Sequence, residues 1–202
     1  MFTQSEPTQP GLFTLMREDA HAALERDPSA ESLRDIVLYS TGLRIVWGHR
    51  WHHWLWERGH RAAALWLAKR MRRRLAADIH PAAQVGRRLT IDHGVGVVIG
   101  GTAIVGDDCL IYQGVTLGMD GKHTQGKRHP TLGNNVMVGA NAVVLGNIEV
   151  GDDSRIGAGA VVVHDVPAHT TAVGVPAHYI KHSAHPHLSI VSDEDLSWSC
   201  AL

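Results

Sequence analysis

Five polar residues of this chain have types and spacings that suit proton transfer and the binding of a small charged molecule. Asp78, Asp92 and His93 stand beside apolar positions of a regular repeat, and Arg128 and His129 close a glycine-containing segment. A histidine with a carboxylate partner can act as a general base, because the carboxylate fixes the orientation and tautomer of the imidazole. An arginine offers a planar fork of donors that matches a carboxylate. Together these residues could remove a proton from a hydroxyl group while they hold an acidic or zwitterionic small molecule.

The same residues also have non-catalytic interpretations. Asp78 and Asp92 could be turn residues whose side chains hydrogen-bond to their own backbone. His93 and His129 could be exposed loop histidines, in a chain that contains 15 histidines. Spacing alone therefore leaves a catalytic role and a structural role open for each of them.

The secondary structure that must position these residues is indicated by apolar residues that recur with a period of six. Apolar residues recur at every sixth position, with one break of seventeen residues after Val115. This period fits neither an amphipathic helix nor the alternation of a half-buried strand. It is typical of a solenoid whose flat sides are one hexapeptide each. The repeat positions are Ile79, Val85, Ile91, Val97, Ala103, Cys109, Val115, Leu132, Val138, Val144, Val150, Ile156, Val162 and Ala168.

We therefore predict a mainly β chain, a left-handed parallel β-helix of hexapeptide repeats preceded by a small α-helical N-terminal domain. A β-sandwich of short strands is the alternative. The expected division is a helical domain over 1–77, a β-helix over 78–180 with an excursion loop over 116–131, and a flexible tail over 181–202. The loop contains glycines, a proline and charges, so it must leave the inner wall, where solenoids place functional residues.

Four helices are expected in the N-terminal domain. They cover 12–26, a segment from Asp27-Pro28 to about Tyr39, a segment between Gly42 and Gly59, and 60–77. Asp followed by Pro is typical of a helix start, because Asp caps the first turn and Pro suits the first helical position. Leu43, Trp47, Trp51 and Trp54 form one stripe of the third helix, which we interpret as a contact between helices or with the solenoid.

Composition narrows the class of protein. The 202 residues carry a formal net charge of −1, which argues against nucleic acid as the main partner. Cys109 falls on an inward repeat position and is expected to be a small buried residue rather than half of a disulfide with Cys200. We expect no membrane span and no signal peptide, and a cytoplasmic location fits.

Several longer strings of the chain are similar to the serine O-acetyltransferase family, whose members open cysteine biosynthesis in bacteria and plants. The resemblance covers almost the whole predicted solenoid and the end of the helical part. Generic hexapeptide acyltransferases share the repeat but not the DIHP, DHG and RHP motifs in this order. The strings are DIHPAAQVG (78–86), IDHGVGVVIG (91–100), KRHPTLG (127–133), VGANAVVLGNIEVG (138–151) and TTAVGVPA (170–177).

The resemblance implies roles for particular residues. His93 corresponds to the family's general base toward the serine hydroxyl, and Asp78 to the carboxylate that orients it. Asp27 and Asp92 are similar to the residues that hold the serine amino group. No metal is implied.

The resemblance also implies how the rest of the substrates bind. Arg128 and His129 are similar to the residues that bind the carboxylate and hydroxyl region of serine. Acetyl-CoA, the co-substrate, would lie along a groove between coils, with contacts from Gly139, Ala140, Ala158 and Gly174. Because Cys109 is expected to point inward, direct attack by serine with both substrates bound is the predicted mechanism.

The family places its active site between neighbouring solenoids of a trimer. The helical part of this chain is short, so a homotrimer is expected, with a hexamer as the alternative. The loop reads GMDGKHTQGKRHP where a more glycine-rich stretch is usual. Several relatives end in an Ile that inserts into O-acetylserine sulfhydrylase, whereas this chain ends Cys200-Ala201-Leu202, which leaves that complex and feedback inhibition by cysteine open.

Three other functions stay open on the residues. The acetyl acceptor could be a homoserine-like amino acid or a sugar, although the paired acids and Arg128 favour an α-amino acid. A zinc enzyme such as a γ-type carbonic anhydrase would need three convergent histidines, and the spacing of His93, His123 and His129 does not resemble that family. A non-enzymatic scaffold that binds a sulfhydrylase would show no turnover of acetyl-CoA with serine.

Overall fold

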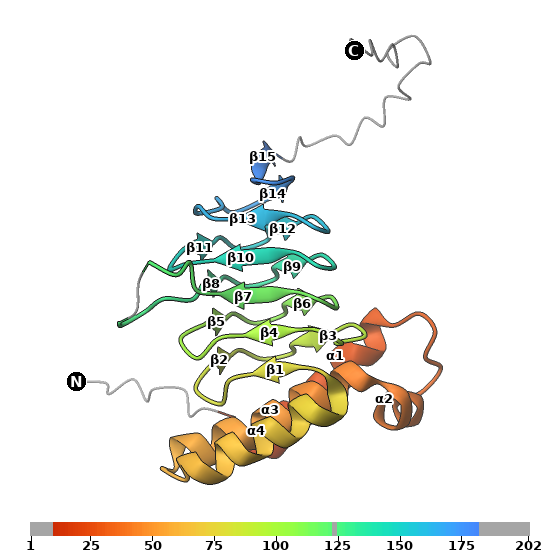
Figure 1. Cartoon of the computed structure of the whole chain (residues 1–202). Helices are drawn as coiled ribbons and strands as arrows, with labels where there is room; N and C mark the ends of the chain where they lie inside the picture. Colours follow the sequence, from red (N-terminus) through yellow and green to blue (C-terminus); the bar gives the residue numbers. More distant parts are fainter. Residues whose placement is uncertain (1–9, 123–124, 182–202) are drawn as a thin grey trace, which may run out of the picture.

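The computed structural model describes residues 10–122 and 125–181, and it forms a tall prism that stands on a layer of helices (Figure 1). The helices are α1 (Leu12–Arg26), α2 (Leu33–Tyr39), α3 (Thr41–Glu57) and α4 (Arg61–Leu75). The strands that follow stack into three sheets, and all pairs are parallel except β14 with β15. The predicted β-helix with a helical N-terminal part is confirmed.

Each sheet takes one strand from each successive coil, which is the arrangement expected of a hexapeptide solenoid. Sheet A contains β1 (Asp78–Ile79), β4 (Val98–Ile99), β7 (Thr116–Gly118), β10 (Val143–Leu145) and β13 (Val161–Val162). Sheet B contains β2 (Gln84–Val85), β5 (Ile104–Val105), β8 (Thr131–Leu132) and β11 (Glu149–Val150). Sheet C contains β3 (Thr90–Ile91), β6 (Leu110–Ile111), β9 (Met137–Val138), β12 (Arg155–Ile156), β14 (Thr170–Val173) and β15 (His178–Lys181).

The predicted repeat positions form the inner wall, with two exceptions. Twelve of the fourteen are buried, whereas Val85 is only partly buried and Ala168 is exposed. The wall also contains the residues two positions before the strand centres, such as Ala83 and Ala142. Each side of a coil therefore buries two residues, the strand centre and the residue two positions before it. A count of six along the sequence can pass from one of these buried positions to the other where the coil length changes, and it still meets buried residues.

Apart from the excursion, the coil length changes twice, and both changes shift the phase of the repeat. In the first coil, paired residues are twenty positions apart, as in Ile79 with Ile99 and Ile91 with Ile111. The corner between β3 and β4 is therefore two residues longer than a hexapeptide predicts, and the centre of β4 is Ile99 rather than the expected Val97. In the last coil Val166 forms the bridge with Val150, which leaves Ala168 on an exposed corner. The expectation of an inward Ala168 was therefore wrong, because the corner before Val166 is shorter by two residues.

Two predictions about the helices also differ from the structure. Asp27 does not cap α2, because its carboxylate accepts hydrogen bonds from the backbone N–H and hydroxyl of Ser29, and the cap is supplied by Ser32. Gly42 does not interrupt α3 but lies in its first turn. A Cβ on Gly42 would stand 1.7 Å from the carbonyl oxygen of Ile91, so glycine lets α3 contact the first coil directly.

The helical layer is fixed to the solenoid by buried charge. Arg50 of α3 is bidentate to Asp19 of α1, at 3.0 and 2.9 Å, and both side chains are buried. The same guanidinium donates to the carbonyl oxygens of Val85 and Gly86 at 2.7 and 2.6 Å. All four acceptor oxygens bind the guanidinium of Arg50, so both charged side chains have hydrogen-bond partners in spite of their burial.

The remaining boundaries are close to those expected. The excursion narrows to 119–130, because β7 runs to Gly118 and β8 begins at Thr131. β15 runs to Lys181, and the rest of the expected tail, 182–202, lies outside the described residues. Cys109 is fully buried, as predicted, and burial raises the pKa of its thiol to about 11. No helix in the described part of the chain is long and apolar enough to span a membrane.

The buried histidines of α3 should make the protein sensitive to acid. His49 and His52 are buried, and their ring nitrogens include atoms without a hydrogen-bond partner. Burial lowers the pKa of His49 well below its usual value and that of His52 to about 4. Below the unfolded-state pKa of about 6.5 the unfolded chain binds more protons, so stability is present above that pH and falls as pH decreases.

We expect the melting temperature to decrease as the pH is lowered from about 7.5 to about 5. The free energy of unfolding should decrease by up to about 1.4 kcal/mol per pH unit for each of the two histidines. The variant His52→Leu should show a weaker pH dependence than the parent, and His21→Ala, at an exposed position of α1, should show the same dependence. A midpoint that is unchanged across this range would contradict the assignment.

Candidate active site

The three sheets meet at corners, and two of these corners carry the predicted site residues. The C–A corner connects each strand of sheet C to the next strand of sheet A, and in the first coil it contains residues 92–97. The A–B corner connects sheet A to sheet B, and it contains residues 80–83, 100–103 and the excursion 119–130 in successive coils. The two corners flank sheet A on opposite sides.

Asp92 and His93 lie on a C–A corner that is longer than those above it. Ile99 is eight residues beyond Ile91, whereas Leu117 is six residues beyond Ile111. The extra length is accommodated by a left-handed backbone at His93, φ 56°, which raises the ring from the coil and leaves its side chain 74% exposed. The phase slip seen in the repeat therefore marks the corner that presents these two residues.

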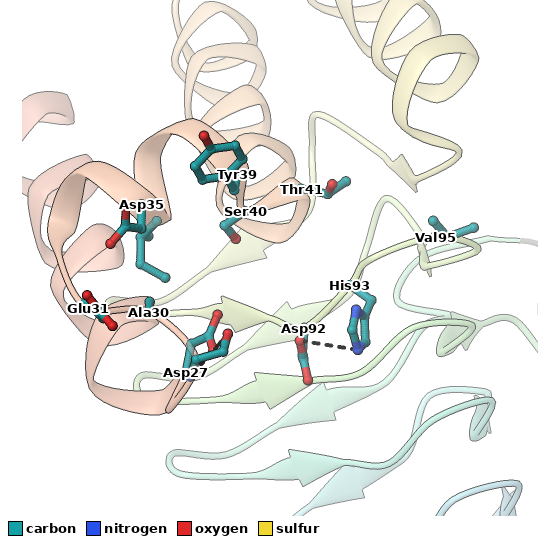
Figure 2. Close-up of a pocket in the computed structure, with 12 residues that line it drawn as sticks. Asp27, Ala30, Glu31, Asp35, Tyr39, Ser40, Thr41, Asp92, His93 and Val95 are labelled. Atoms are coloured by element: carbon teal, nitrogen blue, oxygen red, sulfur yellow. Dashed lines mark hydrogen bonds and ion pairs between the residues drawn. The ribbon is translucent and has the colours of Figure 1, made fainter.

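The Asp92 carboxylate lies beside the His93 ring. Its Oδ1 is 3.9 Å from Nε2, which is an ion-pair distance rather than a hydrogen bond (Figure 2). The backbone under the pair is held by the Asp92 N–H, which donates to the Ile111 carbonyl at 2.9 Å. The imidazole of His93 is thus exposed to small molecules, has a carboxylate beside it, and stands on a corner whose backbone is held in place.

A pocket of about 810 Å³ separates this corner from the segment that links α1 to α3. Figure 2 shows the helical segment on one side and Asp92 with His93 on the other. The pocket is open to solvent along this side of the molecule, so it can admit a small polar substrate. Its lining residues are Asp27, Ser29, Ala30, Glu31, Asp35, Ile36, Tyr39, Ser40, Thr41, Asp92, His93 and Val95.

The charge of this pocket is one-sided. Its lining contains four carboxylates, from Asp27, Glu31, Asp35 and Asp92, and none of the twelve residues is Lys or Arg. The two hydrogen bonds from Ser29, more than the nearby His93, lower the pKa of Asp27, so this carboxylate stays ionised. Such a pocket suits an ammonium group, and it offers no cation of its own for a carboxylate.

Arg128 and His129 lie at the A–B corner, away from this pocket. His129 is buried, and its ring rests on Gly100, where a Cβ would stand 2.0 Å from Nε2. The Thr102 N–H donates to His129 Nδ1 at 3.2 Å, and the Thr102 hydroxyl lies 2.8 Å from the same nitrogen. Burial, followed by the charges of Arg128 and Lys127, lowers the pKa of His129, which favours the uncharged ring.

Asp78 begins β1 on sheet A, and its carboxylate pairs with Arg72 of α4 at 3.0 Å. Both side chains are exposed, at 43% for Asp78 and 67% for Arg72. Within the described residues no hydrogen bond or ion pair joins Asp78 to His93. The structure therefore brings together Asp27, Asp92 and His93, and leaves Asp78 with another partner.

The four positions expected to contact acetyl-CoA belong to the same corner as His93. The register of sheet C places Ile91, Ile111, Val138, Ile156 and Ala172 above one another. Two residues beyond each lie His93, Gln113, Ala140, Ala158 and Gly174, which form a column along the C–A corner. Gly139 is one position earlier in this column, and a Cβ there would stand 2.6 Å from the Ala158 backbone nitrogen.

Sequence reasoning missed part of the pocket and the support of His129. Glu31, Asp35 and Tyr39 line the pocket, and the proximity of residues 28–41 to Asp27 could have suggested them. Thr102 had no such signal, because its partners are 26 and 27 residues away in the chain. No group of three or more His, Cys, Asp or Glu side chains converges as a metal site in the part of the chain that the structure describes.

Comparison with known proteins gives one consistent group of relatives. The bacterial transferase hexapeptide (six repeats) family model matches residues 129–164. Serine acetyltransferase from Mycobacterium tuberculosis is 52% identical over 172 residues, which cover 85% of this chain and 75% of that protein. One solved structure is serine acetyltransferase from Brucella abortus in complex with coenzyme A, with a TM-score of 0.82, 43% identity and coverage of 85% of this chain and 68% of that one.

A second solved structure is serine acetyltransferase from Neisseria gonorrhoeae in complex with serine. Its TM-score is 0.80 at 43% identity, and the match covers 83% of this chain and 68% of that one. All three matches extend over more than four fifths of the chain, which is more than the β-helix alone.

The contact between Gly100 and His129 gives a test of the site geometry. In Gly100→Ala the new Cβ would fall 2.0 Å from Nε2, so the ring must leave its place, at a cost of roughly 1–3 kcal/mol. We expect a lower thermal midpoint and faster modification of His129 by a histidine-specific acylating reagent, followed by mass spectrometry.

Gly118, at the same corner position one coil further, provides the matched control. A Cβ there would stand 3.0 Å from the flexible end of Leu145, so Gly118→Ala should leave the reactivity of His129 unchanged. Equal His129 reactivity in Gly100→Ala and in the parent protein would mean that the ring does not rest on Gly100.

Proposed function

The chain belongs to the serine acetyltransferase family, and we infer that it transfers the acetyl group of acetyl-CoA to the hydroxyl of L-serine. The products are O-acetylserine and free coenzyme A, and the reaction is the first step of cysteine biosynthesis. The observation that supports the assignment to a site is the C–A corner, where the acidic pocket at His93 stands at one end of a column whose other end consists of the small residues Ala140, Ala158 and Gly174. The pocket suits the amino acid and the column suits a long, narrow acyl carrier.

We propose that His93 is the general base. Its imidazole takes the proton of the serine hydroxyl as the oxygen attacks the thioester carbonyl, and a tetrahedral intermediate forms. Collapse of that intermediate breaks the carbon–sulfur bond, and the proton on His93 goes to the leaving thiolate. The buried thiol of Cys109, with its raised pKa, is unsuited to form an acyl-enzyme, which supports direct transfer between the two substrates.

The orienting role of Asp78 stays a proposal, and it requires a change of partner. Its present ion pair with Arg72 joins two exposed side chains, and such pairs contribute only about 0–1 kcal/mol. A change of the Asp78 partner from Arg72 to His93 on substrate binding therefore costs little. Asp92, 3.9 Å from the His93 ring, is already placed to stabilise the imidazolium that forms during the reaction.

We propose that the serine ammonium is held by Asp27 and Asp92, which face each other across the pocket (Figure 2). The serine carboxylate needs a cation, and the pocket of one chain has none. Arg128 and His129 supply suitable donors, but they lie beyond sheet A at the A–B corner. A neighbouring copy of the chain that brings its A–B corner against the C–A corner would complete the site.

The outer face of sheet A supports such an assembly. Apart from Asp78 in β1 and Thr116 in β7, the side chains on this outer face are apolar, whereas sheet B shows Gln84, Thr131 and Glu149 beside Ile104 on its outer face. A head-to-tail contact that buries this face and joins two different corners can close into a ring, and a three-sided prism suits a ring of three, so we propose a homotrimer, with a hexamer as the alternative. The apolar outward residues of sheet A are Val98, Val143, Leu145, Val161 and Val163.

A finer proposal concerns the location of the protein in the cell. A cytoplasmic location suits Cys109, which is a free buried thiol. Association with O-acetylserine sulfhydrylase stays open, because the C-terminal residues that would carry it lie outside the described part of the chain.

The proposed reaction is tested by thiol release from acetyl-CoA in the presence of L-serine, homoserine or an amino sugar. Serine should give the highest kcat/KM. In His93→Asn, which tolerates the left-handed backbone but is no base, kcat should fall by about a hundredfold to ten-thousandfold.

His21→Ala, at an exposed histidine of α1, serves as the control and should keep parental activity. A loss of less than about threefold in His93→Asn would remove His93 from the role of base. Preference for homoserine or a sugar would reassign the acceptor while leaving the acetyl transfer in place.

The shared site predicts that assembly and activity fail together. A glutamate at Val98, on the outer face of sheet A, would bury an unpaired charge, at a cost of several kcal/mol. Light scattering on Val98→Glu should give the 22.0 kDa mass of one chain instead of three times that value, with loss of turnover.

Gln84→Glu adds the same charge to the outer face of sheet B and should leave both mass and turnover unchanged. An active Val98→Glu protein with the mass of a single chain would show that one chain holds a complete site.

A further inference from the structure

Thr102 makes an unusually complete set of contacts to the Arg128–His129 pair. The register of β5 with β8 aligns Ile104 with Thr131, so Thr102 lies directly under His129 in the stack. Its hydroxyl oxygen accepts from the backbone N–H of Arg128 at 3.0 Å and from that of His129 at 3.2 Å. One side chain thus fixes the backbone where the excursion returns to the coil.

The same threonine also sets the chemistry of the His129 ring. The Thr102 N–H can only donate, and it points at His129 Nδ1 at 3.2 Å, so Nδ1 is the acceptor and carries no proton. The hydroxyl hydrogen remains free to donate to the same nitrogen, 2.8 Å away, because both lone pairs of Oγ1 already accept. A neutral ring in this setting has its proton on Nε2.

An imidazolium is disfavoured in the same place. A proton on Nδ1 would face the Thr102 N–H, and burial together with the charge of Arg128 acts in the same direction. Nε2 has no hydrogen-bond partner among the described residues, and it lies over Gly100 on the side of the A–B corner. His129 is therefore an uncharged donor whose N–H is left for a ligand.

We propose that Thr102 is a positioning residue that holds Arg128 and His129 at the subunit boundary and fixes His129 as an uncharged Nε2–H donor toward the amino-acid substrate. This inference rests on the proposed function for the identity of the substrate. It adds the reason why a buried histidine, rather than a second cation, stands beside Arg128. A neutral donor can bind the carboxylate or hydroxyl of serine without competing with His93 for the proton that is transferred.

The inference is tested by Thr102→Val, which removes the hydroxyl and keeps the branched shape. We expect kcat/KM for serine to fall by about tenfold to a hundredfold, because three hydrogen bonds are lost. The loss should appear mainly as a higher KM for serine, with little change in KM for acetyl-CoA, since Arg128 and His129 would bind the amino acid in both ground and transition states. Thr102→Ser, which keeps the hydroxyl, should retain activity within about threefold.

Two readouts do not depend on turnover. Imidazole nitrogen NMR of the parent protein, assigned by the signal lost in His129→Gln, should show His129 neutral at neutral pH with its proton on Nε2. Amide hydrogen exchange at Arg128 and His129 should be faster in Thr102→Val than in the parent, because both N–H groups lose their acceptor. Thr131→Val, the same change two residues beyond His129, is the control and should alter neither exchange nor kinetics.

The outcomes separate this inference from the function on which it rests. Failure of the parent protein to acetylate serine would overturn the function, while the NMR and exchange results would still judge the role of Thr102. A charged ring, a proton on Nδ1, or a kcat/KM for serine in a folded Thr102→Val protein within about threefold of the parent would overturn the inference. If Thr102→Val does not fold, the NMR tautomer of the parent and the kinetics of Thr102→Ser decide it.

Discussion

The structure depends on the stacking of short parallel strands whose inward side chains fill one continuous core. Each coil stacks on its neighbour, and together they enclose the core. The coil to which a residue belongs sets its height along the prism axis, and the side or corner of the coil on which it lies sets the direction in which its side chain points. This constraint carries His93, Ala140, Ala158 and Gly174 to one edge, although 81 residues separate the first from the last. It also holds Thr102 under His129, where two threonine atoms decide the protonation of a ring in the next coil.

The helical layer uses the same frame from below. Gly42 allows α3 to contact the carbonyl of Ile91, and Arg50 ties α1 and α3 to the carbonyls that end β2. Because Ile91 directly precedes Asp92, this contact sets the distance between the helical segment and the corner. The pocket is thus formed by two parts of the chain whose separation is fixed by one direct backbone contact and by the buried side chain of Arg50.

The residues of the inner wall could be predicted because the core requires an apolar residue on each side of each coil, and this requirement appears in the sequence as apolar residues at every sixth position. The slip after Ile91 and the exposed Ala168 could not, since they depend on corner lengths that a six-residue count passes over. Asp27 was recognised as a site residue by resemblance, and it lines the pocket, but its expected role as a helix cap was wrong because Ser29 and Ser32 compete for the same turn. The ion pair of Asp78 with Arg72 was not predicted, although only six residues separate them, because the turn between α4 and β1 decides that the two side chains meet.

The last strand of the described chain runs against all the others. β15 pairs with β14 in the antiparallel direction, at the end of the stack farthest from the helices (Figure 1). A parallel coil with an open edge would be a template on which the first or last coil of another molecule could add, and repeated addition would build a fibre. With β15 folded back over sheet C at one end and α3 and α4 packed against the first coil at the other, the regular parallel stack is interrupted at both ends, which disfavours the addition of further coils along the prism axis.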